Sequence, residues 1–168
     1  MLPDTNVLVA AYRADHVHHV TASQWLMKFL QESLDGQMLV LPMQVVSGFI
    51  RLVTNARIFP LVSSATQAIE FVDWLLSDPK AHLLGKTSEW PVLRQLIVDK
   101  QLMANHIPDA WLASQAISLS EPFVTFDKGF RQLLPRSLLV LLPATAQAGD
   151  PSVSELFGIA PDFDPKAP

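Results

Sequence analysis

Three aspartates are the residues of this chain whose types and positions are best suited to chemistry. Asp4, Asp109 and Asp127 each stand directly after a short apolar run. In an α/β fold, residues at the carboxyl ends of strands meet at one edge of the sheet, even when they are far apart in the chain. Carboxylates gathered near a surface repel one another by roughly 4 kcal/mol per pair unless a cation lies between them. The pattern therefore predicts a divalent metal site, for Mg²⁺ or Mn²⁺, formed by these three residues.

Polar and basic residues close to these aspartates are of types that support such a site. Asn6 follows Asp4 by two residues, where it can cap the next helix and orient Asp4. Thr125 points to the face opposite Phe126, and we expect it to hydrogen-bond near the site. We expect phosphate contacts from three basic side chains, Arg51, Lys128 and Arg131. For Arg51, an ion pair with a core carboxylate is the alternative.

A cluster of histidines also stands out, but its spacing does not favour a metal centre. His16, His18 and His19 open a helix, with no acid or cysteine at ligand spacing. We therefore interpret them as a solvated helix start. The four tryptophans fall on helix faces, which indicates core or dimer contacts before base stacking.

Bulk composition limits the class of protein. A chain of 168 residues with 49% hydrophobic composition has the size of one ordinary domain with a real core. The lack of cysteine excludes disulfides and thiolate zinc sites, and it fits a reducing compartment. No basic leader precedes the first apolar run, and the apolar stretches are shorter than a membrane span. The sequence thus predicts a soluble cytoplasmic protein without a membrane partner.

The net charge of −4 is unevenly distributed. The segment from 143 onward holds four acids and one base, hence −3, which leaves −1 for the rest. This total neither supports nor excludes nucleic-acid binding, because local patches matter more. We expect one domain over 1–142 and a tail rich in Pro, Ala and Asp over 143–168.

Hydrophobic periodicity alternates between strands and helices along the chain. The predicted strands are 1–3, 38–41, 81–84, 123–126 and 138–142. The first predicted helix follows Asn6, the second spans 21–34, and the third continues through Val45 to Val53. The fourth opens at a Ser64/Gln67 capping box, the fifth starts at Ser88 with Pro91 in its first turn, and the sixth spans 109–119. Such alternation predicts a mainly parallel sheet covered on both faces.

Four motifs in order resemble the PIN-domain family and, more narrowly, the VapC-type ribonuclease toxins of bacterial toxin–antitoxin pairs. They are Leu2-Pro3-Asp4-Thr5-Asn6-Val7-Leu8, the segment from Gly48 to Asn55, Pro108-Asp109-Ala110-Trp111-Leu112-Ala113, and the segment from Val124 to Phe130. The resemblance implies a three-layer α/β/α sandwich and metal-dependent endonucleolytic cleavage of RNA. It also implies that Asp4, Asp109 and Asp127 hold the metal, and that the partners are RNA, a small antitoxin and a second copy of the chain.

The chain departs from the family pattern at one position. The family usually has a glutamate early in the helix after the second strand, and Gly48 stands there instead. Gln44 or Ser47 could supply a neutral oxygen in its place. A PIN-like RNA-binding or regulatory module that has lost catalysis therefore stays open as a second function. A phosphatase with Asp4 as nucleophile is disfavoured, because Asn6 stands where such enzymes have a second aspartate.

Overall fold

The computed structural model describes residues 1–32 and 36–144. The strands of this part are β1 (Leu2–Pro3), β2 (Leu39–Leu41), β3 (Ala81–Leu83), β4 (Phe123–Thr125) and β5 (Leu139–Leu141). The helices are α1 (Thr5–Tyr12), α2 (His19–Glu32), α3 (Met43–Val53), α4 (Ala65–Ser77), α5 (Trp90–Lys100) and α6 (His106–Leu119), with 3₁₀ helices η1 (Lys128–Gln132) and η2 (Arg136–Leu138).

The strands of this part pair in parallel. β4 lies between β1 and β5, and β2 pairs with β3. The Val40 N–H donates to the Met1 carbonyl at 2.8 Å, which joins β2 to β1. The strands therefore lie in the order β3-β2-β1-β4-β5, and their carboxyl ends share one edge.

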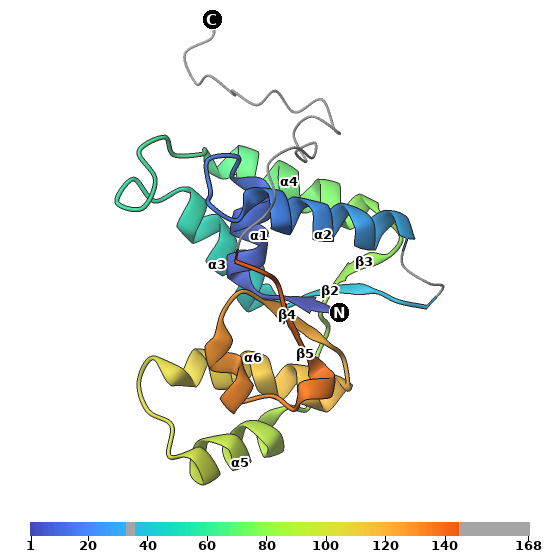
Figure 1. Cartoon of the computed structure of the whole chain (residues 1–168), viewed down its shortest axis with the longest axis vertical. Coiled ribbons are helices and arrows are strands. Elements are labelled where there is room, and N and C mark those ends of the chain that lie inside the picture. Colours follow the sequence, from blue (N-terminus) through green and yellow to red (C-terminus); the bar gives the residue numbers. More distant parts are fainter. Residues whose placement is uncertain (33–35, 145–168) are drawn as a thin grey trace, which may run out of the picture.

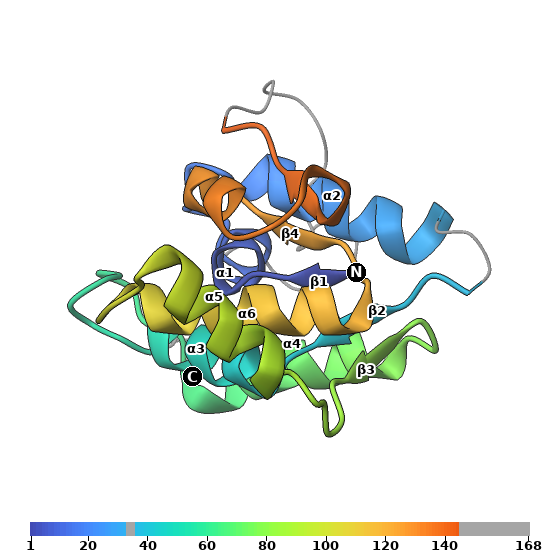
Figure 2. The ribbon, with the colours of Figure 1, turned by 90° about the horizontal axis from the view of Figure 1, so that it is seen from below.

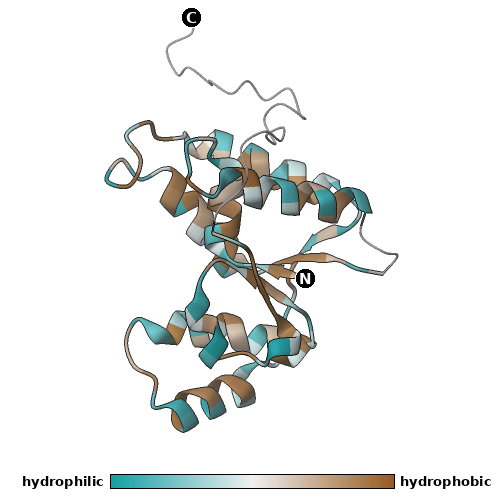
Figure 3. Cartoon of the chain, viewed as in Figure 1, coloured by the Kyte–Doolittle hydropathy of each residue, from teal (hydrophilic) through white to brown (hydrophobic). Residues whose placement is uncertain are grey.

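Helices cover both faces of this sheet. In Figure 1, α1 to α4 lie above the strands and α5 and α6 below them, and Figure 2 shows α5 and α6 from below. The central strands are mostly hydrophobic (Figure 3), and Leu2, Leu39, Leu41 and Phe123 are fully buried. Strands covered on both faces bury apolar side chains in both directions. The predicted three-layer α/β/α sandwich is thus confirmed.

Several predicted boundaries differ from the structure. Asp4 in extended conformation precedes α1, so Asn6 lies inside the helix instead of capping it. Glu89 precedes α5 in place of Ser88. α6 begins at His106, so Asp109 lies in the first helical turn and does not follow a strand. Pro108 permits this early start because the first turn of a helix leaves backbone N–H groups unused.

Other expectations agree with the structure or lie beyond it. Ser64 and Gln67 form the predicted capping box at α4. α2 begins at His19, two residues before the predicted start, and the last two residues predicted for that helix lie outside the described residues. The predicted tail over 143–168 also lies outside them, except for its first two residues. Among the residues described, no helix is long and apolar enough to cross a membrane.

Candidate active site

Asp4 is fixed at the carboxyl end of β1, beside β4. Its backbone N–H donates to the Val124 carbonyl at 2.8 Å, and the residue is only 8% exposed. β1 is short because Asp4 leaves the sheet at once to begin α1. Strand pairing therefore places one carboxylate in a largely desolvated position at the sheet edge.

The Thr125 hydroxyl connects the residues around Asp4. It donates to Asp4 Oδ2 at 2.6 Å and accepts from Asn6 Nδ2 at 3.0 Å and from the Asp127 N–H at 2.9 Å. Asn6 Nδ2 also donates to Asp4 Oδ2, at 2.7 Å. A hydroxyl offers one donor and two acceptor positions, so Thr125 is fully used. The predicted supporting residues Asn6 and Thr125 thus contact Asp4 directly.

The three predicted aspartates interact electrostatically. The pKa of Asp4 is raised to about 6, mainly because burial opposes the charged form. The charges of Asp109 and Asp127 also raise this pKa, while the hydrogen bond from Thr125 lowers it. Burial and then Asp127 also raise the pKa of Asp109, while His106 lowers it. No lysine or arginine in 1–32 or 36–144 forms an ion pair with any of the three aspartates.

The carboxylates are close enough to repel but are not arranged as a finished metal cage. In the described part of the chain, no group of three or more His, Asp or Glu side chains is placed to hold a metal. Asp127 Oδ1 instead accepts the Gly129 N–H at 2.7 Å, at the start of η1. The donor set nevertheless fits Mg²⁺ or Mn²⁺, because these ions prefer carboxylate oxygens and would relieve the repulsion.

Gly48 has a packing reason to be small. A Cβ atom at this position of α3 would lie 3.1 Å from Thr5 Oγ1 and 3.2 Å from Thr5 Cγ2. Thr5 directly follows Asp4, so an acid at position 48 would press on the start of α1. Gln44, one turn earlier on α3, donates to the Pro108 carbonyl at 3.3 Å, and its Oε1 is buried without a partner among the residues described. Gln44 therefore contacts the turn that carries Asp109, while the Ser47 hydroxyl bonds the backbone of its own helix.

The predicted basic residues are exposed, and within the described ranges they form no ion pair. They are Arg51 on α3, and Lys128 and Arg131 on η1. Lys128 and Arg131 follow Asp127 on the same loop. Arg131 also lines a cavity of about 500 Å³ with Arg136 and three leucines, and none of the three aspartates lines it. In the described part of the chain, these three side chains are therefore open to solvent and do not pair with the three aspartates.

The interpretation of the histidines as a solvated helix start is wrong. His19 is 5% exposed, and its Nδ1 lies 2.9 Å from the Ala10 carbonyl. His18 stacks on Phe126. The sequence pattern did not reveal the stacking of His18 on Phe126, because these two residues are more than a hundred positions apart. The one available indication was that Phe126 stands between the site residues Thr125 and Asp127.

We expect Thr125→Val to destabilise the fold and to weaken the site. Valine keeps the shape but leaves Asp4 Oδ2 with one donor fewer and the Asp127 N–H unpaired. Leaving such buried groups unpaired costs about 1–3 kcal/mol. The pKa of Asp4 should rise further, since the hydrogen bond from Thr125 lowers it. Urea unfolding and the pH profile of RNA cleavage check both effects, with Thr125→Ser as the control that keeps the hydroxyl. Equal stability of Thr125→Val and the parent would contradict this role.

Comparison with known proteins identifies the family. The PIN-domain model matches residues 1–133, which include all three aspartates. The chain therefore belongs to the PIN-domain family.

Individual relatives are named as VapC ribonucleases. The ribonuclease VapC43 of Mycobacterium tuberculosis is 38% identical over 128 residues, which cover 76% of this chain and 85% of the relative. The ribonuclease VapC31 of the same organism is 36% identical over 133 residues, covering 77% and 89%. These matches confirm the resemblance to VapC-type proteins drawn from the four motifs.

A solved structure supports the fold. A chain in the crystal structure of VapBC2 from Rickettsia felis, bound to a DNA fragment from their promoter, superposes with a TM-score of 0.59. The match covers 84% of this chain and 98% of that chain at 17% identity. The arrangement of helices and strands is thus shared, although the sequences have diverged widely.

Proposed function

We propose that this chain is a metal-dependent endoribonuclease that acts as the toxin of a toxin–antitoxin pair. The observation that carries the proposal is the trio Asp4, Asp109 and Asp127, in which burial and repulsion raise the pKa of Asp4. Within 1–32 and 36–144, no basic side chain pairs with this trio. Membership of the PIN-domain family and similarity to VapC ribonucleases support the substrate class.

Each residue of the trio has a role that follows from its position. A bound Mg²⁺ or Mn²⁺ ion would lower the pKa of a water and offset charge on the phosphate. Asp4 and Asp109 would hold the ion, and Asp127, the most exposed of the three, would orient the water. Thr125 and Asn6 keep Asp4 Oδ2 in one orientation through their hydrogen bonds. Lys128 and Arg131, on the loop after Asp127, provide positive charge for the phosphates of the RNA.

We infer two protein partners and a location. The similar crystal structure is of VapBC2 with DNA from their promoter, and this pairing supports an antitoxin that binds this chain.

Trp90 and Val98 on α5 are 65% and 62% exposed, and α5 has no buried residue, which supports a homodimer contact on that helix. An RNA substrate supports a cytoplasmic location. The family match ends at 133, which supports a catalytic unit over 1–142 and a separate tail.

Incubation with a structured RNA and Mn²⁺ tests the activity. We expect endonucleolytic fragments with Mn²⁺ and none when EDTA is in excess, because the ion activates the water. Gel separation of end-labelled RNA checks this. Cleavage that persists in EDTA would contradict the metal-dependent mechanism.

A non-catalytic RNA-binding module is the second candidate, and Gly48 favours it. Glycine at this position leaves the site with one carboxylate fewer than the family pattern, and a longer side chain there would require the Thr5 side chain to shift by a few tenths of an ångström. This module would bind the RNA in the same assay and leave it intact at all Mn²⁺ concentrations.

A further inference from the structure

Two stacked rings lie beside the candidate active site and have no part in the roles proposed so far. The imidazole of His18 faces the ring of Phe126, with centroids 4.6 Å apart and planes inclined by 20°. Phe126 lies between Thr125 and Asp127 in the chain, and its N–H donates to Asn6 Oδ1 at 3.4 Å. The ring pair therefore adjoins the carboxylates through both the backbone and Asn6.

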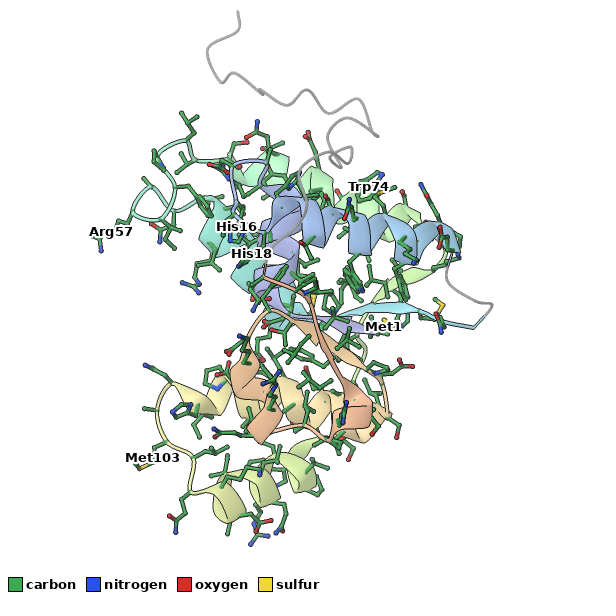
Figure 4. All side chains as sticks on the ribbon, in the orientation of Figure 1. Met1, His16, His18, Arg57, Trp74 and Met103 are labelled. Atoms are coloured by element: carbon green, nitrogen blue, oxygen red, sulfur yellow. The ribbon has the colours of Figure 1, made fainter. Side chains whose placement is uncertain are left out.

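His16 adds a hydrogen-bond donor next to this pair. Its Nδ1 accepts the His18 N–H at 3.1 Å, and the two imidazoles lie 5.6 Å apart, next to each other beside α1 (Figure 4). A neutral imidazole whose Nδ1 accepts carries its proton on Nε2. Burial lowers the pKa of His16, which keeps the ring neutral at pH 7. His16 thus carries an Nε2–H group on a ring that lies beside that of His18.

The loop that carries these rings is anchored at both ends. Arg13 binds the two oxygens of Asp15 at 2.8 and 2.5 Å, and its Nη1 donates to the Leu61 carbonyl at 2.7 Å. At the other end, His19 Nδ1 contacts the Ala10 carbonyl. The rings are therefore presented in one orientation, as a binding surface requires.

Internal packing alone does not account for a histidine at position 18. His18 Nδ1 is buried, and among the described residues it has no hydrogen-bond partner. Unsatisfied buried polar atoms are rare in native proteins and require an explanation. A phenylalanine at this position would make the same ring contact with Phe126 without that cost. Part of the His18 ring nevertheless stays open to a ligand, because the residue is only partly buried.

We propose that His18, supported from behind by Phe126, is a stacking surface for a nucleobase next to the phosphate that is cleaved. The proposal rests on the RNA-cleaving function and specifies where the RNA lies. Proteins recognise single-stranded RNA by stacking exposed bases on aromatic rings and histidines and by hydrogen bonds to the base edges. The Nε2–H group of the neighbouring His16 is a donor of the kind that such a bond requires.

RNA affinity of ring variants tests this assignment. We would measure fluorescence anisotropy of a short fluorescein-labelled single-stranded RNA at several salt concentrations, in an Asp4→Asn background that leaves the RNA intact. His18→Ala should raise the Kd about tenfold, the range found when one stacked base loses its aromatic partner. His18→Phe should stay within about twofold of the parent, since it keeps the ring. Val17→Ala, at a 79% exposed position of the same loop, is the matched control and should bind like the parent.

Three results would overturn the proposal. They are an unchanged Kd for His18→Ala, an equal loss in His18→Phe and His18→Ala, and a shallower salt dependence in His18→Ala, which would indicate a phosphate contact in place of stacking. Thermal unfolding of each variant shows whether the fold is retained. Failure of the ribonuclease function itself appears separately, as intact RNA when the unmodified chain is incubated with Mn²⁺.

Discussion

Asp4→Asn is expected to reduce RNA cleavage by about a hundredfold to a thousandfold while the protein stays folded. Asparagine can still accept the hydrogen bonds from Thr125 and Asn6, so the network around position 4 is retained. What is lost is the negative charge that holds the cation, and removal of one strong electrostatic contact at a reaction centre costs about 10²–10³ in rate. Cleavage rates with Mn²⁺ measure the effect.

The matched control is Asp73→Asn, which removes the same charge from an exposed position on α4. It should cut RNA at the parent rate. Unfolding of both variants should be cooperative. At neutral pH, Asp4→Asn should be more stable than Asp73→Asn, because a buried charge near two other acids has been removed. Full activity of Asp4→Asn would remove Asp4 from the mechanism.

The second large effect is a dependence of metal-free stability on pH. The pKa of Asp4 is about 6 in the fold and 3.8 in the reference state, so folding favours the protonated form. This contribution is fully present below about 3.8 and is lost as pH rises through about 6. Between about pH 7.5 and about pH 5, Asp4 should therefore add about 1 kcal/mol to the free energy of unfolding.

Comparison with Asp4→Asn isolates this contribution from opposing groups. The pKa of His16 is lowered by burial, so its protonation in the unfolded chain opposes the gain as pH falls below about 6.5. The difference in unfolding free energy between the parent and Asp4→Asn cancels the contribution of His16, and it should change by about 1 kcal/mol between the two pH values. Saturating Mn²⁺ should abolish the change, because the ion favours the ionised carboxylate. A difference that is independent of pH without metal would contradict the desolvated position of Asp4.

The sequence predicted the sheet and its layers because most strands are short apolar runs and several helices have a regular apolar face. Runs such as Leu39–Leu41 are buried on both sides and leave little choice of structure. The capping box of Ser64 and Gln67 is equally local, and it is present as predicted. Such features depend on residues that are neighbours in the chain, which is why a single sequence shows them.

Features that depend on distant residues were harder to predict. The start of α6 at His106 moved Asp109 from the first residue of the predicted helix to a later position in its first turn, since the short apolar run Ile107-Pro108 is itself helical. The stacking of His18 on Phe126 and the burial of His19 follow from the packing of the loop after α1 against β4 and α1. The close contact of Gly48 with Thr5 likewise required coordinates.

The most direct test of the central claim is a crystal grown with Mn²⁺ and measured for anomalous scattering at the manganese edge. We predict one anomalous peak bound by Asp4 together with Asp109 or Asp127, with these carboxylates drawn closer than in the metal-free chain. A preparation that cleaves RNA with Mn²⁺ but shows no peak among these three side chains would contradict the account.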